Sequence, residues 1–294
     1  MSDSPQKLPS PPKILVHSVK YYRANWRSLL PFVAIPVIAS LISTLIKNPV
    51  SLNIIISILG SIIGFLSAIA FLLALKGSKE SISKIYVTSL RKILPLAWIN
   101  FLAALVSLGG YILLIVPGII ISILLNFATF AYIFEDQKGT QALMRSWHLV
   151  SGNKLSVFWR LLFFAIASLL FSIPIMMINI PFAISVFQGA RPPAPSAFGG
   201  IYSTLVYGLL IAPLGTIYAY SIYSYLTQLK PQPVSTQEEA KIRKRIHIFM
   251  VLGGIGIVLL ISISLFIIAV LVTGFLNLPQ AVPSYTPLPA PNSI

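Results

Sequence analysis

Two adjacent carboxylates, Glu135 and Asp136, are the clearest residues in this sequence that could do chemistry, and they directly follow a long apolar segment. Neighbouring carboxylates at the end of a helix can bind a cation. They can also pair with nearby basic residues such as Arg145 or Arg160, or simply end a helix in water. A solvated helix end or a salt bridge to a neighbouring basic residue is favoured over a cation site. This interpretation predicts no catalytic residue at this place.

The other titratable residues form no pattern that is typical of a catalytic or metal site. The sequence has three histidines, and none of them has the spacing of the helical zinc motif His-Glu-x-x-His. Neither a serine-nucleophile elbow nor a phosphate-binding loop is found. We therefore expect no bound metal, no cofactor and no enzymatic activity.

One polar residue inside the apolar segments is a candidate for ligand contact. Asn126 lies roughly midway along residues 111–134, which are expected to form one membrane span. A hydrogen bond to another helix is the simpler role for its amide, and contact with a ligand is the alternative. Arg160 lies near the start of its own apolar segment, so its guanidinium is expected to reach the membrane surface.

The elements that must position these residues are membrane helices. Of the 294 residues, 56% are hydrophobic and only 9% are charged, whereas about 25% of an average soluble protein is charged. So few charges cannot cover the surface of a soluble chain, but lipid can cover an apolar one. The net charge of +15 then indicates anionic lipid headgroups as partners, rather than nucleic acid. The sequence has no cysteine, which excludes disulfides and thiol chemistry.

We predict an all-α fold, a polytopic transmembrane helical bundle of about seven spans, because a span needs about 20 apolar residues. The third and fourth spans come from one apolar run that is long enough to cross twice. Their turn is placed at Gly109-Gly110, with Pro117-Gly118 as the alternative, and Pro117 would then kink the fourth span. The expected spans are 29–46, 52–75, 94–108, 111–134, 155–180, 201–229 and 246–276.

The basic residues predict how this bundle is oriented. With the N-terminus in the cytoplasm, 19 of the 21 Lys and Arg residues fall on the cytoplasmic side, and only Lys47 and Arg191 fall outside. This asymmetry follows the positive-inside rule. It predicts a multi-pass plasma-membrane protein with an external C-terminus.

Five regions follow from this interpretation. Residues 1–13 are expected to be a disordered cytoplasmic N-terminus, and residues 277–294 a disordered, Pro-rich external tail. Residues 14–230 form a six-span membrane domain. Residues 231–245 form a basic cytoplasmic connector, and residues 246–276 an additional transmembrane helix.

Short amphipathic helices are expected in the cytoplasmic connections, lying in the membrane interface. The clearest covers residues 140–151, with Thr140 as N-cap and Gly152 just beyond its end. One face would carry Ala142, Ser146 and Trp147, with the tryptophan at headgroup level, and the opposite face Arg145.

Small residues predict where helices approach each other closely. Gly60, Gly64 and Ala68 recur at four-residue spacing in the second span. Such spacing lets another backbone come near, and a partner within the same chain is favoured over dimerisation. The glycines around Gly253 in the last span are interpreted in the same way.

Residues 114–160 resemble a known family. The segment begins with Leu-Ile-Val-Pro-Gly-Ile at 114–119 and its span is closed by Glu135-Asp136. The residues that carry the rest of the resemblance are Gly139, Ala142, Leu143, Arg145, Ser146, Trp147, Gly152, Asn153 and Phe158. Together with Pro117 and Gly118 they resemble the membrane domain attached to some glycerophosphoryl diester phosphodiesterases. The same domain occurs in stand-alone bacterial and archaeal proteins, and residues 223–229 are similar to its usual end.

The resemblance implies a six-helix core over about residues 14–230, with its loop motif in the cytoplasm. It implies no hydrolysis, because in those enzymes hydrolysis belongs to a separate soluble barrel that no segment of this chain could form. We expect a non-enzymatic scaffold or accessory factor that acts through lipids or partner proteins. A transporter or lipid-translocating protein with proline-broken helices is the alternative, and an intramembrane lipid enzyme is a less favoured third.

Overall fold

The computed structural model describes residues 8–45, 50–77, 80–189, 197–232 and 234–276. Eleven α-helices and one π-helix, with no β-strand, make up this part of the chain. Six helical stretches are long and apolar enough to cross a membrane, and two of them, Ile115–Glu135 and Phe198–Leu229, each combine consecutive helices. Seven spans result if one bent pair also counts as a span. The prediction of an all-α helical bundle of the membrane-spanning type is confirmed.

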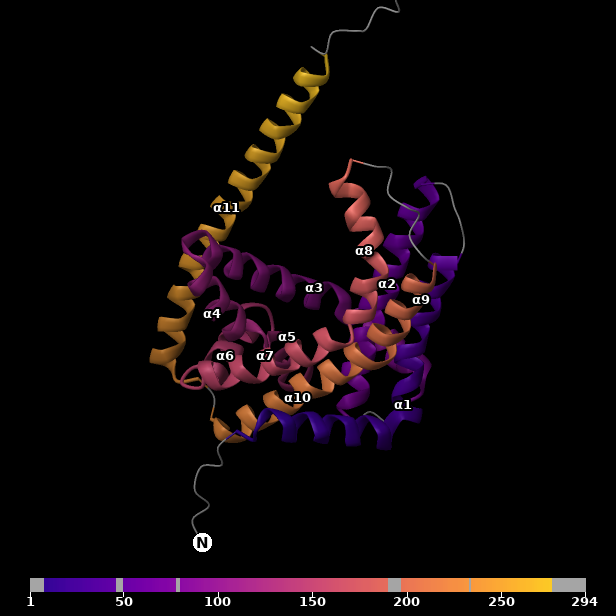
Figure 1. Cartoon of the computed structure of the whole chain (residues 1–294). Coiled ribbons are helices and arrows are strands. Elements are labelled where there is room, and N and C mark those ends of the chain that lie inside the picture. Colours follow the sequence, from indigo (N-terminus) through magenta and orange to yellow (C-terminus); the bar gives the residue numbers. More distant parts are fainter. Residues whose placement is uncertain (1–7, 46–49, 78–79, 190–196, 233, 277–294) are drawn as a thin grey trace, which may run out of the picture.

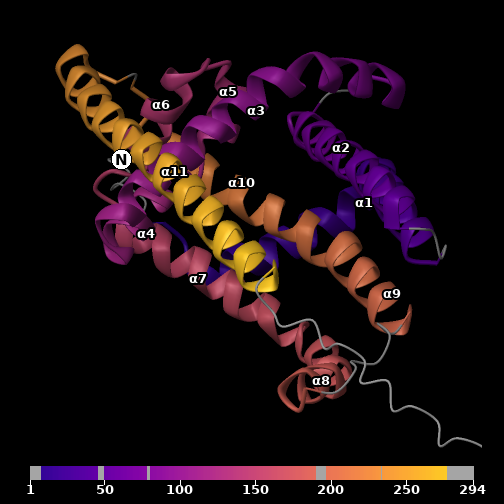
Figure 2. The same cartoon turned by 90° about the horizontal axis from the view of Figure 1, so that it is seen from above.

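Four helices point the same way in one view. In Figure 2, α2 (Val50–Leu75), α7 (Lys154–Leu170), α10 (Ala212–Leu229) and α11 (Thr236–Leu276) run in roughly the same direction across the picture. The short helices α5 (Ala128–Glu135) and α6 (Thr140–Val150) lie near the end at which α11 begins. The acidic pair and the residues that follow it are therefore gathered at one end of the bundle.

The first helix, α1 (Pro11–Leu45), begins long before the predicted first span, 29–46. In Figure 1 its first part runs across the lower end of the molecule and its last part turns upward. Pro31 and Pro36 lie inside it, and a proline there removes a helical hydrogen bond and bends the helix. The predicted disordered N-terminus is wrong for residues 11–13, which are already helical, and residues 1–7 lie outside the described part.

The turn between the third and fourth spans is at neither predicted place. Helix α3 (Ile82–Leu113) continues through Gly109-Gly110, and Leu114 alone, in extended conformation, separates it from α4 (Ile115–Leu125). Pro117 lies in the first turn of α4, where its missing N–H costs no helical hydrogen bond, so it does not kink the span. Helix α3 also begins well before the predicted third span, 94–108.

Gly109 instead permits a close contact between α3 and α11. A Cβ added at Gly109 would lie 1.9 Å from the carbonyl oxygen of Phe249, and one at Gly253 would lie 2.0 Å from that of Leu105. Side chains at these positions would hold the two backbones apart. The interpretation of Gly253 as a packing residue is confirmed, whereas the turn assigned to Gly109 is wrong.

The small residues of α2 behave differently. No heavy atom in the described part of the chain lies within 4 Å of a Cβ built at Gly60 or Gly64, and Ala68 is exposed. The predicted contact with another span of the same chain is therefore not made there.

The later spans are interrupted or extended. A break at Phe171-Ser172 separates α7 from α8 (Ile173–Phe187), and a π-helix, Tyr207–Ile211, separates α9 (Ala197–Val206) from α10. Helix α11 begins at Thr236, so most of the predicted connector and the seventh span form one continuous helix. Lys47, Arg191 and the tail at 277–294 lie outside the described residues.

Candidate functional site

Glu135, the last residue of α5, is the centre of a polar network. Its Oε2 accepts a hydrogen bond from Arg145 Nε at 2.7 Å, and its Oε1 accepts one from the Tyr223 hydroxyl at 2.6 Å. The carboxylate thus joins the end of α5 to α6 and α10. The predicted pairing with Arg145 is confirmed, and each oxygen of Glu135 already has a protein donor.

Arg145 is buried, although it was expected on the polar face of its helix. It is only 8% exposed. Besides Glu135 it reaches two carbonyl oxygens of the connection after α10, that of Gln232 at 3.1 Å and that of Lys230 at 3.3 Å. A buried guanidinium is tolerated when a carboxylate and further acceptors replace its hydration water, and this set supplies both.

Lys230 holds the other end of α6. Its Nζ donates to the carbonyl oxygens of His148, at 2.6 Å, and Ser151, at 2.5 Å. A cation is favourable at a helix C-terminus, where carbonyl groups lack helical partners. Burial lowers the pKa of Lys230, nearby Glu238 opposes this shift, and Arg145 adds to it.

His148 connects α6 to the last helix. Its Nδ1 lies 2.9 Å from Glu238 Oε1, near the start of α11. The polar network of Glu135, Arg145, His148, Tyr223, Lys230 and Glu238 therefore joins α5, α6, α10 and α11. We call these six residues the polar network.

Helix α6 is covered by neighbouring parts of the chain. Eight of its 11 residues are buried, and Trp147 is only 5% exposed, so the predicted exposed face of an interfacial helix is not found. Gly139, not Thr140, is the N-cap. Gly152 follows the helix with a φ of 88°, as a glycine at a helix end is expected to do, and the chain then turns by 98° into α7.

Ser146 forms hydrogen bonds with backbone groups at a break in the fourth span. Its Oγ donates to the carbonyl oxygen of Leu124 at 2.7 Å and accepts from the backbone N–H of Phe127 at 3.1 Å, where α4 ends and α5 begins. Asn126 lies at the same break with an exposed side chain. In the described part of the chain that side chain forms no hydrogen bond, so the predicted interhelical bond is not made.

Other motif residues have simple structural places. Asp136 turns the chain after α5 with a left-handed φ of 54°. Its side chain is 70% exposed and lies 3.7 Å from Lys92 Nζ, a surface pair. Ala142 is fully buried, and Asn153 is the N-cap of α7. None of these contacts requires a ligand.

Sequence reasoning missed the role of Arg160. This residue is only 8% exposed, so its guanidinium is covered by other parts of the chain. Its Nε donates to the carbonyl oxygen of Pro9 at 2.9 Å, and its Nη2 to that of Leu8 at 2.6 Å. Arg160 thus ties α7 to the segment before α1. No local pattern could have revealed a contact between residues so distant in sequence.

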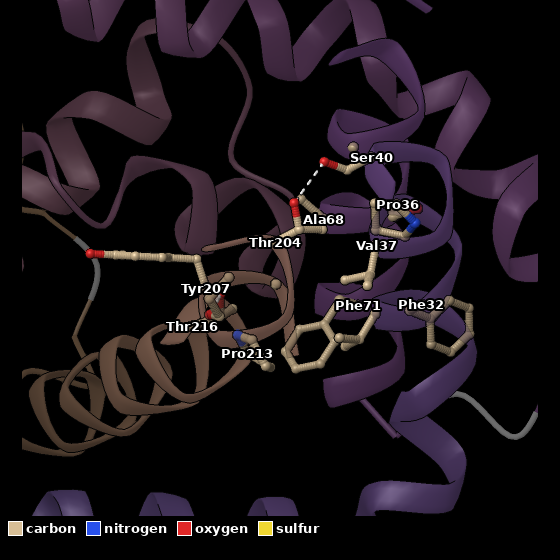
Figure 3. A pocket seen from close by; sticks show the side chains of 15 residues that line it. Phe32, Pro36, Val37, Ser40, Ala68, Phe71, Thr204, Tyr207, Pro213 and Thr216 are labelled. Atoms are coloured by element: carbon tan, nitrogen blue, oxygen red, sulfur yellow. Dashed lines mark hydrogen bonds between the residues drawn. The ribbon is translucent and has the colours of Figure 1, made fainter. Parts of the chain in front are cut away.

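An apolar pocket of about 370 Å³ lies elsewhere in the bundle, between α1, α2 and the α9–α10 region. Figure 3 shows Val37 and Phe71 directed into it, with Pro213 on the opposite wall. Tyr207, in the π-helix, also lines it, and its hydroxyl is hydrogen-bonded to Ser172 at the break between α7 and α8. No residue of the polar network lines this pocket.

The comparisons with known proteins identify a family for this architecture. A family model described as a domain of unknown function, DUF7847, matches residues 36–226. The chain belongs to this family. The matched DUF7847 region contains the acidic pair, all of α6 and the walls of the apolar pocket contributed by α2 and α9–α10, and it ends before α11. No curated protein and no solved structure matches the chain.

Proposed function

We propose that this protein is a non-enzymatic scaffold or accessory factor of the plasma membrane that acts through anionic lipids or partner proteins at its cytoplasmic end. One observation carries the proposal. Glu135 and Arg145, the motif residues best suited to chemistry, are occupied by each other, by Tyr223 and by backbone carbonyl groups. Their geometry supports a role in holding helix ends together.

The distribution of charge supports lipids as partners. Lys241, Arg243 and Lys244 lie near the start of α11, at the end of the molecule that also holds the polar network. Near an anionic membrane surface each such residue contributes about 1 kcal/mol of attraction. The proposal places this end in the cytoplasm and the C-terminus outside the cell, in agreement with the positive-inside rule.

Lipid mass spectrometry of the purified full-length chain tests the proposed partner. The protein is reconstituted in phosphatidylcholine vesicles with a fraction of phosphatidylglycerol and then re-extracted. We expect co-purified lipid enriched in phosphatidylglycerol, with a smaller enrichment for Lys241→Gln/Lys244→Gln. A control, Gln137→Asn, leaves the charge unchanged. Failure to enrich an anionic lipid, together with the absence of any protein partner in crosslinked membranes, would overturn the proposal.

Cysteine labelling tests the orientation, because the natural chain has no cysteine. Lys241→Cys is expected to resist a membrane-impermeant maleimide in intact cells, whereas Arg191→Cys, which lies outside the described residues, reacts. Labelling of both positions from the same side contradicts the topology.

A second candidate function is the translocation of lipid or small solutes. The observation in its favour is the irregular backbone of the later spans. The Tyr202 hydroxyl donates to the carbonyl oxygen of Phe171 at 3.3 Å, at the break between α7 and α8, and the π-helix follows at Tyr207–Ile211. Broken helices line the substrate sites of many transporters. Vesicles containing the protein that move neither fluorescent phospholipid nor solute exclude this function.

We also propose an evolutionary relation to the membrane domain associated with glycerophosphoryl diester phosphodiesterases. The motif residues between 114 and 160 support it. The relation carries no proposal of phosphodiesterase activity.

A further inference from the structure

We propose that the apolar pocket between α1, α2 and α9–α10 binds one aliphatic chain of a membrane phospholipid. The pocket has a volume of about 370 Å³ and is lined mainly by apolar side chains, among them Val33, Val37, Phe71 and Pro213. This site goes beyond the proposed function, which concerns the charged cytoplasmic end of the molecule.

The few hydroxyl groups in the wall are already hydrogen-bonded. Ser67 Oγ is paired with the Tyr86 hydroxyl at 3.1 Å, and Thr216 Oγ1 donates to the carbonyl oxygen of Ala212 at 2.9 Å. Water needs several polar partners to occupy a cavity. The wall therefore favours hydrocarbon over water or a polar solute.

The helices around the pocket carry prolines and a π-helix. Pro36 lies inside α1, where a proline is expected to bend a helix, and Pro213 follows the π-helix at the start of α10. At Gly208 the two sides touch, since a Cβ there would lie 2.4 Å from Val37 Cγ2. At Gly64 no heavy atom in the described part of the chain lies within 4 Å of an added Cβ. The space is thus closed at one wall and open along α2.

The opening leads to the surface that lipid covers. Gly64 and Ala68 line the pocket, and Gly60 continues the same stripe of α2 beyond it with open space above. On the same side of α2, Ser57, Ser61 and Ala68 are exposed. In a membrane this face is in contact with hydrocarbon, so the pocket is continuous with the lipid phase. This continuity identifies the occupant as a lipid chain.

A polar group marks one end of the pocket. In Figure 3, Ser40 and Thr204 face each other across the gap between α1 and α9, and their hydroxyl oxygens lie 3.3 Å apart. The pair uses one of its two hydroxyl hydrogens and leaves the other free for an acceptor. An ester carbonyl of the lipid whose chain fills the pocket is such an acceptor.

Photo-crosslinking tests the site. The full-length protein is reconstituted in phosphatidylcholine vesicles that contain a trace of phosphatidylcholine with a diazirine in one acyl chain. After irradiation, labelled peptides are mapped by mass spectrometry. The exposed half of α11, including Val258 and Phe266, reports contact with bulk lipid. We expect labelling of the pocket peptides of α1 and α10 above the level of α11.

Two variants of α2 provide the matched comparison. Gly64→Trp places a large side chain in the pocket, whereas Gly60→Trp places the same side chain on the same stripe outside it. We expect Gly64→Trp to reduce labelling of α1 and α10 to the level of α11, and Gly60→Trp to leave it unchanged. The labelling of α11 in both variants shows that the protein remains inserted.

Three results would overturn the proposal. The first is labelling of the pocket peptides no stronger than that of α11, which indicates bulk lipid only. The second is that Gly64→Trp and Gly60→Trp reduce the labelling of α1 and α10 equally, or that neither reduces it. The third comes from a parallel arm with a diazirine fatty acid, in which labelling by the fatty acid but not by the phospholipid identifies a different ligand.

Discussion

The Tyr223 hydroxyl donates a hydrogen bond to Glu135 Oε1 over 2.6 Å, although the two residues are 88 positions apart. Tyr223 lies on α10, and Glu135 ends α5. Glu135 is therefore held from two directions, because Arg145 binds its other oxygen. The polar network depends on this arrangement, and five predictions test it together with the close helix packing.

Removing the tyrosine hydroxyl is expected to destabilise the protein. Tyr223→Phe deletes a hydrogen bond to a charged acceptor, for which a loss of about 1.5–3 kcal/mol is typical. The free energy of unfolding is measured in detergent micelles. Tyr225→Phe on the same helix is the control, because no hydrogen bond of the Tyr225 hydroxyl is found in the described part of the chain. Equal losses in both variants contradict the role of Tyr223.

Breaking the Glu135–Arg145 pair is expected to cost more than breaking a surface pair. Arg145→Met leaves a carboxylate in the network without its cation, and we expect a loss of about 2–4 kcal/mol. Arg243→Met breaks the exposed i,i+4 pair with Glu239, whose atoms lie 2.8 Å apart, and such pairs contribute about 0.3–0.5 kcal/mol. The same unfolding measurement applies.

A double variant separates the pair from its surroundings. Arg145→Met/Glu135→Gln removes both charges, so its loss of stability is expected to be smaller than the sum of the two single losses. Additive losses would show that the two side chains act independently.

The contact between α3 and α11 leaves no room for a methyl group. Gly253→Ala would place a Cβ 2.0 Å from the carbonyl oxygen of Leu105, and a backbone atom cannot move aside as a side chain can. We expect a loss of about 1–3 kcal/mol, as for overpacking in a core. The control is Gly254→Ala, which meets no described atom within 4 Å. Equal stability of the two variants would be inconsistent with this packing.

The lowered pKa of Lys230 is expected to make the free energy of unfolding depend on pH in the alkaline range. Burial lowers its pKa below the ordinary 10.5. Between the lowered pKa and 10.5 the unfolded chain binds more protons than the folded one, so the free energy of unfolding rises with pH in this window. Lys230→Met is expected to reduce that slope, whereas Lys241→Met, an exposed lysine of α11, preserves it. Identical slopes for the three proteins would exclude the effect.

The sequence by itself determined the membrane-type helical class and the place of most helices. These follow from the lengths of the apolar runs, which are local properties of the chain and depend only on the thickness of hydrocarbon. It also determined local contacts such as the pair Glu239–Arg243 and the glycine after α6, because residues close in sequence meet in any helix.

Only the tertiary structure decided which side chains are buried and what they meet. Trp147 and Arg145 are residue types that are typical of an interfacial helix, yet α6 is covered by its neighbours. Gly109 belongs to a Gly-Gly pair that is typical of a turn, yet it lies inside α3, where the backbone of α11 packs closely against it. Arg160 binds the carbonyl groups of Leu8 and Pro9, which precede the first helix. Periodicity describes one helix at a time, whereas burial depends on partners that are distant in sequence, and no pattern along the chain specifies them.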